Sequence, residues 1–204
     1  MKVLITGFEP FGGEEINPSW EAVKVLPEKI DGATLVKRQL PVTFRGVKEL
    51  LPKLIVEEKP DVVILTGQAG GRPNITVERI AINVMDSAIA DNEGYKPEDE
   101  PVFEEAPAAY FATIPVKAIV KALREAKIPA SVSNTAGTYV CNTAMFTALH
   151  TIAVAGMETR AGFIHVPFIH EQALDKPRPS MALETIARAF EVVVRTSIGE
   201  QKGY

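Results

Sequence analysis

Short continuous apolar runs alternate along this chain with longer stretches in which apolar residues recur at helical spacing. The short runs predict strands at 2–6, 33–40, 61–66, 75–84, 110–114, 129–133 and 161–166. Helical spacing predicts helices over 17–26, 43–55, 115–123 and 141–155, with a last one beginning at 179. This alternation predicts an α/β fold in which helices cover both faces of a mainly parallel, twisted sheet. Because no repeat or linker interrupts it, we expect residues 1–204 to form a single domain.

Several residues mark where these elements begin, bend or end. Asn17 and Pro18 have the residue types of a helix N-cap and first helical position, and Thr43 starts the next helical pattern. Pro52 lies inside that second pattern and predicts a kink or a break. The polar stretch 86–105 predicts a long surface loop.

The composition narrows the class of function. The chain has 204 residues, 46% of them hydrophobic and 24% charged, with a net charge of −4. A chain with a net negative charge has no excess of positive charge to attract nucleic acid or an anionic membrane surface, so we expect neither as a partner. There is one cysteine, which fits a reducing compartment, and no stretch that predicts a signal peptide or membrane span. We therefore expect a cytoplasmic protein, and no sequence spacing predicts a metal site.

Two side chains that could take part in nucleophilic or acid–base chemistry lie near one edge of the predicted sheet. Ligands of open α/β sheets collect beyond the carboxyl ends of the strands, and Cys141 and His165 both approach that edge. Cys141 opens a helix, where free N–H groups and the helix dipole favour a thiolate and could hold an oxyanion. Residues alone leave two interpretations of Cys141 open, a catalytic nucleophile and a small buried apolar residue.

Two further residues have the same ambiguity. His165 lies in an apolar strand, where it could act as the base for Cys141 or be a core histidine bonded to backbone. Glu78 lies in the segment ITVERIAIN, where it could orient the histidine or face solvent beside Arg79.

Two glycine-rich segments could contact a ligand. The loop GQAGG at 67–71 could cradle phosphate, although it lacks the lysine and hydroxyl residue of a P-loop. The segment GFEPFGG carries Phe8 and Phe11, which could pack in the core or form an apolar wall for a small ring.

Five longer motifs together resemble the pyroglutamyl peptidase I family of cysteine peptidases, also called pyrrolidone-carboxylate peptidases. They are GFEPFGG, NPSWEAV, GQAGGRPNITVERIAIN, TAGTYVCN and GFIHVPF, and the resemblance runs from residue 1 to about residue 198. It implies a three-layer α/β/α sandwich and a cytosolic hydrolase that needs no cofactor. It also implies a homo-oligomer, frequently a tetramer.

The resemblance also implies roles for individual residues. Glu78, Cys141 and His165 would form a catalytic triad that hydrolyses the bond after an N-terminal pyroglutamyl residue of a peptide, through a thioester. Phe8 and Phe11 would pack on the pyrrolidone ring, and Gln68 would recognise its lactam group. A neutral, largely apolar pocket suits that ring, because a charged N-terminal ammonium would be costly to desolvate there.

This chain departs from the family pattern in one place. After IAIN the family commonly reads DARIPDN, whereas this chain has Ala88 in place of the arginine and Ala90 in place of the proline. The resemblance gives that arginine a part in the active site, and Arg72 or Arg79 are candidates to replace it. Two other functions stay open from the sequence, a nucleoside- or phosphate-handling enzyme and an inactive relative that binds pyroglutamyl peptides.

Overall fold

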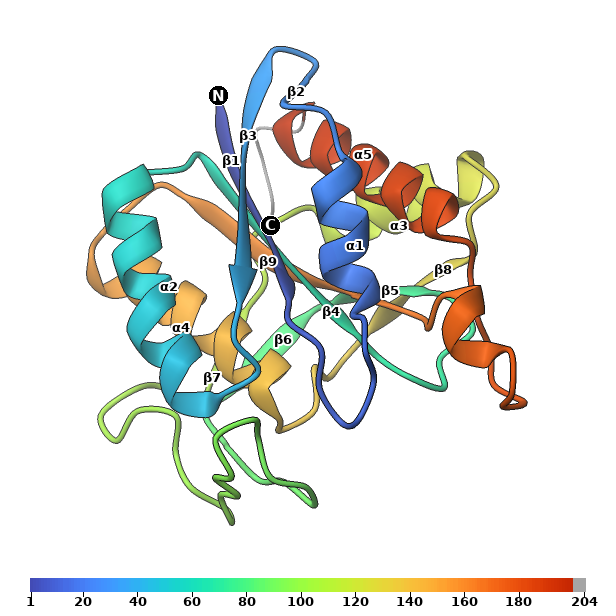
Figure 1. Ribbon diagram of the computed structural model, residues 1–204. Helices are drawn as coiled ribbons and strands as arrows, with labels where there is room; N and C mark the ends of the chain where they lie inside the picture. The colour runs from blue at the N-terminus through green and yellow to red at the C-terminus, as the bar shows by residue number, and fades with distance from the viewer. Residues whose placement is uncertain (200–204) are drawn as a thin grey trace.

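The computed structural model describes residues 1–199, in which seven strands form the central sheet. In spatial order they are β2 (Lys29–Ile30), β3 (Ala33–Leu40), β1 (Lys2–Phe8), β4 (Val62–Gln68), β9 (Arg160–Val166), β5 (Ile75–Glu78) and β8 (Ala130–Ser133). All neighbours run parallel except β2 with β3 and β5 with β9. The predicted, mainly parallel sheet is therefore confirmed, and Figure 1 shows its twist.

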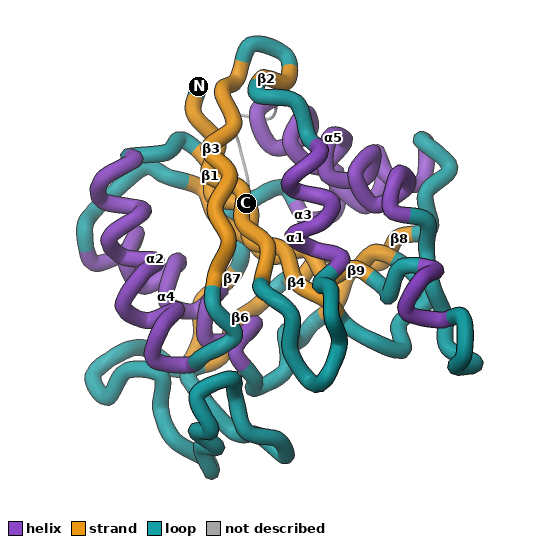
Figure 2. Tube along the Cα trace, in the orientation of Figure 1, coloured by secondary structure: helices purple, strands orange, loops and turns teal. Residues whose placement is uncertain are grey.

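Helices cover both faces of this sheet, which confirms the three-layer α/β/α sandwich (Figures 1 and 2). One layer contains α1 (Pro18–Val25), α3 (Val116–Glu125) and α5 (Leu183–Gly199). The other contains α2 (Phe44–Glu58) and α4 (Val140–Val154). A 3-10 helix, η1 (His170–Ala173), follows β9.

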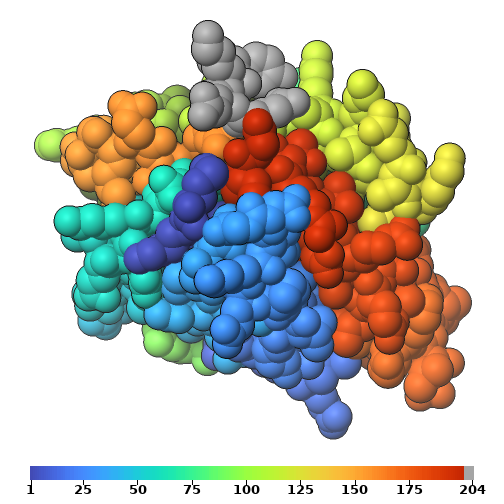
Figure 3. Space-filling model, turned by 90° about the horizontal axis from the view of Figure 1, so that it is seen from above, coloured from blue at the N-terminus to red at the C-terminus, as the bar shows by residue number. Residues whose placement is uncertain are grey.

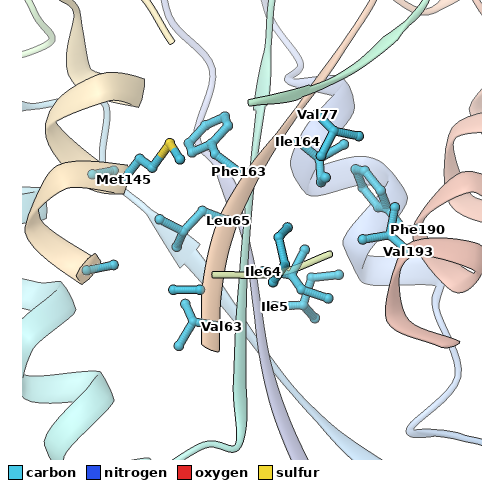
Figure 4. Packing of buried hydrophobic residues seen from close by; sticks show 14 of the residues in the cluster. Ile5, Val63, Ile64, Leu65, Val77, Met145, Phe163, Ile164, Phe190 and Val193 are labelled. Carbon is cyan, nitrogen blue, oxygen red and sulfur yellow. The ribbon is translucent and has the colours of Figure 1, made fainter. Parts of the chain in front are cut away.

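The hydrophobic core lies on both sides of the central strands. Figure 4 shows Leu65 and Phe163 pointing toward α4, while Ile64 and Ile164 point toward α5 and its Phe190. Alternate residues of a strand face opposite sides of a sheet, so a strand covered on both faces must be apolar at every position. This requirement explains the uninterrupted apolar runs of β4 and β9.

The single extended segment predicted over 75–84 is instead two strands in different sheets. After β5, the chain turns at Arg79 into β6 (Ile80–Ile82), which pairs antiparallel with β7 (Ala109–Phe111). The Arg79 N–H bonds to the Ser133 carbonyl, and its own carbonyl accepts from Ala112 N–H, so one residue serves both sheets.

Both helix starts marked by local residue types are confirmed. Asn17 caps α1 by accepting from Ser19 N–H, and Thr43 caps α2 by accepting from Gly46 N–H. The predicted break at Pro52 is wrong, because α2 runs without interruption from Phe44 to Glu58. The start at 179 is also wrong: Met181 N–H bonds to the Phe168 carbonyl, and α5 begins only at Leu183.

The segment 86–105 is irregular, as predicted, but it is tied to the rest of the molecule. Asp91 accepts a hydrogen bond from Phe44 N–H at the start of α2, where the helix dipole stabilises a negatively charged carboxylate. Asn92 donates to Glu9 and to the Pro10 carbonyl. These contacts hold the loop against the carboxyl edge of the sheet. Within the described residues, no helix is long and apolar enough to cross a membrane.

Candidate active site

A cavity of about 270 Å³ opens at the carboxyl ends of β1, β4 and β9. It brings together five of the six predicted site residues, and the sixth, Glu78, lies behind His165. The lining side chains and backbone come from Phe8, Phe11, Asn17, Val42, Gln68, Ala69, Gly70, Arg72, Ala136, Gly137, Tyr139, Val140, Cys141 and His165.

Glu78 and His165 form a buried hydrogen-bonded pair. Strands β5 and β9 run antiparallel, which sets Glu78 opposite Phe163 and Thr76 opposite His165. The Nδ1 atom of His165 lies 2.8 Å from Oε1 of Glu78. Glu78 is completely buried and His165 almost so, which contradicts a solvent-facing Glu78.

Arg72 is a second partner of the Glu78 carboxylate. Its Nη1 atom donates to Oε1 of Glu78 at 2.7 Å and to the hydroxyl of Thr76 at 2.6 Å. Arg72 also lines the cavity, whereas Arg79 is not among the lining residues. Of the two arginines considered from the sequence, Arg72 is therefore the one at the site.

The pair has a defined charge state at neutral pH. Burial opposes ionisation of Glu78, but bonding to His165 and Arg72 outweighs it and lowers the pKa of Glu78. Burial lowers the pKa of His165, and the bond to Glu78 offsets this only in part. The carboxylate is therefore ionised and the imidazole neutral. Neutral His165 donates from Nδ1 to Glu78, which leaves Nε2 as a proton acceptor.

Cys141 occupies the first turn of α4, and the start of this helix carries no side-chain cap. Tyr139 at the N-cap position makes no capping hydrogen bond, in contrast to Asn17 and Thr43 in α1 and α2. The first N–H groups of a helix have no intrahelical partner, so this turn presents free donors beside the sulfur. Asn142 fixes the turn in place, because its side chain bonds to Ile82 N–H and to the Ile82 and Val84 carbonyls.

Gly67 makes room for the sulfur of Cys141. It pairs with His165 in the register of β4 and β9. A Cβ atom at residue 67 would lie 2.9 Å from the Sγ atom of Cys141 and 2.8 Å from the ring of Phe163. Only glycine lets the sulfur lie against the strand beside His165.

The thiol of Cys141 is protonated at neutral pH. Burial raises its pKa to about 12, the charge of Glu78 acts in the same direction, and Arg72 opposes both. The free thiolate expected from the helix N-terminus is therefore not the resting form. The resting pair is a thiol and a neutral imidazole that line one cavity.

The residues predicted to bind the ring line the same cavity. Phe8 is buried and packs on Phe163, so it belongs to the core as well as to the cavity wall. Phe11 is partly buried and packs on Tyr139, with ring centroids 6.1 Å apart. Gln68 ends β4 at the cavity.

The glycine-rich segment 67–71 does not form a phosphate cradle. Its first two residues belong to β4, Ala69 N–H bonds to the Val166 carbonyl, and Gly70 lies against the ring of Phe168. A larger hollow, of about 670 Å³, lies at the opposite edge of the sheet, the end viewed in Figure 3. Neither cysteine nor histidine lines it, so the chemistry belongs to the smaller cavity.

The departure from the family pattern lies at the cavity rim. Asp86 N–H bonds to the Thr138 carbonyl, and the Tyr139 hydroxyl donates to the carbonyl of Ala90. The exposed Ala88 lies between these two anchors, on the segment that contacts the residues preceding Cys141.

Sequence reasoning missed several residues of the site. Tyr139 and Asn17 line the cavity, and Asn142 and Gly67 position Cys141. All four lie inside the motifs of the family resemblance, which was a usable signal. Gln172 bonds to Gln68 from more than a hundred residues away, and no sequence pattern indicated that contact.

An α/β sandwich with a cysteine at an uncapped helix start, and a histidine–carboxylate pair in the same cavity, has the arrangement of a cysteine-dependent hydrolase. Comparison with known proteins identifies the family. The sequence model described as pyroglutamyl peptidase matches residues 1–200. The chain belongs to this family of cysteine peptidases, and the predicted resemblance and enzyme class are thereby confirmed.

Individual relatives agree with this assignment. A pyrrolidone-carboxylate peptidase of Thermococcus onnurineus is 83% identical over 198 residues, covering 97% of this chain and 99% of that protein. The solved pyrrolidone carboxyl peptidase of Thermococcus litoralis is 46% identical with a TM-score of 0.94, covering 97% of this chain and 93% of that one. Pyroglutamyl peptidase I of Bacillus amyloliquefaciens is 42% identical with a TM-score of 0.95, covering 100% and 99%.

Proposed function

We propose that this peptidase removes N-terminal pyroglutamate through a thioester on Cys141, with His165 as base and Glu78 as the residue that orients it. The observation that carries the proposal is the buried 2.8 Å bond from His165 to Glu78, in a cavity that also contains the chain's single cysteine. Nucleophile, base and orienting carboxylate are the three roles that such hydrolysis needs.

The charge states support a proton transfer coupled to attack. Cys141 begins as a thiol, and Nε2 of neutral His165 accepts its proton as the sulfur adds to the pyroglutamyl carbonyl carbon. The resulting imidazolium is stabilised by the ionised Glu78 carboxylate. His165 then returns the proton to the leaving amine, and the amide C–N bond breaks.

The start of α4 offers hydrogen-bond donors that would stabilise the oxyanion formed in each step. Its uncapped N–H groups, including that of Cys141, would donate to the oxyanion that forms when sulfur attacks. Water next attacks the thioester while His165 accepts its proton. The thioester C–S bond breaks, pyroglutamate leaves, and Cys141 is protonated again.

The cavity supports recognition of a small neutral ring. Phe8 and Phe11 would contact the faces of the pyrrolidone ring, and Gln68 would bond to the lactam group. A peptide with a free N-terminal ammonium would have to lose the hydration of its charge against these rings, which disfavours its binding.

The test is the replacement of Cys141. We expect Cys141→Ser to lower turnover of a chromogenic pyroglutamyl amide by at least about a thousandfold. We also expect Glu78→Gln to lower kcat with the fold retained, whereas Glu98→Gln, an exposed matched change, leaves it unaltered. Retained activity in Cys141→Ser would refute the thioester route. Binding of the amide by the unaltered chain without product would favour the inactive relative suggested by Ala88.

Two properties of the whole protein extend this proposal. We propose that the chain works in the cytoplasm, which its single cysteine supports because a reducing compartment keeps the thiol free. We also propose that it assembles as a homotetramer, which the family resemblance supports.

A further inference from the structure

Gln172 lies on η1, outside the lining of the active-site cavity, and its side-chain amide has one defined orientation. Its Oε1 accepts from Ile169 N–H at 3.1 Å, and one of the two N–H groups on its Nε2 donates to the carboxylate of Glu14 at 3.1 Å, with the Ile16 carbonyl as a longer contact at 3.4 Å. A backbone N–H can only donate, whereas a carboxylate and a carbonyl can only accept. These partners therefore fix which end of the Gln172 amide is oxygen and which is nitrogen.

The acceptor that orients Gln172 is itself held in place. Glu14 bonds to Arg178 at 2.8 Å, and both side chains are partly buried. The hydrogen bond from Arg178 is the main cause that lowers the pKa of Glu14, so its carboxylate is ionised. The Arg178 guanidinium also lies over the ring of Phe168, 4.1 Å from its centroid. The orientation of Gln172 thus rests on a connected group of side chains.

Gln172 transmits this orientation into the cavity. Its Nε2 also lies 3.0 Å from Oε1 of Gln68, which lines the cavity. Because Nε2 is a donor, Gln68 must present its oxygen to Gln172. The two N–H donors of Gln68 are then the part of that amide available to a ligand.

We propose that Gln172 is a positioning residue that fixes the orientation of the Gln68 amide, so that the site selects a ring bearing a carbonyl. This inference rests on the proposed role of Gln68 in lactam recognition. A Gln68 amide free to rotate could offer either its oxygen or its nitrogen. Held by Gln172, it offers N–H groups, which match the lactam carbonyl of a pyroglutamyl residue and no group of a plain hydrocarbon ring.

The experiment compares two competitors that differ only in the lactam. Pyroglutamamide and cyclopentanecarboxamide share a five-membered ring and a carboxamide, and each is tested as an inhibitor of pyroglutamyl amide cleavage. We expect Gln172→Glu to reduce the preference for pyroglutamamide by about tenfold or more, because a carboxylate accepts from Gln68 and turns the Gln68 oxygen toward the ligand. We expect Gln172→Met, which removes the donor without adding charge, to have a smaller effect in the same direction.

Further readouts separate positioning from a structural role. In Gln172→Glu and Gln172→Met we expect the KM for the pyroglutamyl amide to rise. In the same variants kcat and the rate of Cys141 alkylation by iodoacetamide should change less than about threefold. Glu171→Gln, on the same 3-10 helix, is the matched control. Equal weakening of both competitors, or an unchanged preference in Gln172→Met and Gln172→Glu, would overturn the inference. Gln68→Met is measured in parallel: an unchanged preference there would instead refute the role of Gln68, and with it the basis of this proposal.

Discussion

At the scale of single residues, the site is defined by how burial and partners distribute protons. Glu78 stays ionised because His165 and Arg72 both bond to it, whereas burial keeps His165 neutral and Cys141 protonated. A resting thiolate–imidazolium pair would need the opposite shifts in the cysteine and the histidine. The proposed reaction would therefore start from an uncharged thiol on Cys141 and an uncharged imidazole on His165.

This charge distribution predicts how alkylation of Cys141 depends on pH. Because the pKa of Cys141 is raised to about 12, its thiolate fraction should grow about tenfold per pH unit across pH 6 to 9. The rate of carboxamidomethylation by iodoacetamide, followed by intact mass, should increase in parallel and reach no plateau. A small free thiol titrated under the same conditions is the control. A plateau below pH 7 would show that Cys141 rests as a thiolate.

At the scale of elements, the start of α4 is where the fold and the chemistry meet. Asn142 is completely buried and joins this helix to Ile82 at the end of β6 through two hydrogen bonds, and to the Val84 carbonyl just after β6 through a third. The small β6–β7 sheet, which lies outside the central sheet, thus serves to hold the first turn of α4. That turn carries Cys141 and the free N–H groups beside it.

This anchoring predicts the result of replacing Asn142 by alanine. The change leaves one N–H and two carbonyls of β6 and its vicinity without their partner, so the free energy of unfolding should fall by about 2 to 4 kcal/mol. Because the first turn of α4 loses its attachment, kcat should fall as well, measured at a temperature where the variant is fully folded. The control is Asn83→Ala, whose lost bonds join residue 83 to the loop at 103–106 without involving α4. It should lose stability but retain kcat.

Elements were predictable from the sequence wherever local chemistry decides them. The apolar runs of β4 and β9 and the caps Asn17 and Thr43 depend on neighbours in sequence, so pattern alone located them. The split between β5 and β6 depends instead on partners from β8 and β7, which are distant in sequence. Pro52 stays helical although local propensity disfavours it, because packing of the apolar face of α2 overrides one unfavourable residue.

The candidate site was predictable in part for a similar reason. The motifs around Glu78, Cys141 and His165 are contiguous and distinctive, and the structure brings Cys141 and His165 to one cavity with Glu78 behind. The protonation of Cys141 was not predictable, because it depends on how deeply the folded chain buries the sulfur. The contact of Gln172 with Gln68 depends on tertiary structure alone.

At the scale of the whole molecule, the side chains of Cys141 and His165 lie at one edge of the central sheet. In the part of the chain that the structure describes, helices pack on both faces of that sheet. The proposed nucleophile, Cys141, belongs to the helical layer that contains α4, and its proposed base, His165, belongs to the sheet. Relative movement of the layers would therefore separate them. Catalysis in this arrangement requires the sandwich to behave as one unit.

The proposed assembly predicts a second property at this scale. Sedimentation equilibrium at micromolar concentration should give four times the mass of the chain, and dilution should not change kcat while the assembly persists. A single chain mass with full activity would refute the tetramer, and it would leave the mechanism intact because every proposed catalytic group belongs to one chain.

The central claim is that the sulfur of Cys141 bonds covalently to the substrate acyl group. The most direct test is acid quenching of the protein during turnover of a pyroglutamyl amide, followed by mass spectrometry of the intact chain and its peptides. The claim predicts one added pyroglutamyl group, located on Cys141 and absent when hydroxylamine is added to cleave thioesters. An acyl group on any other residue, or cleavage at full rate with Cys141 blocked, would contradict it.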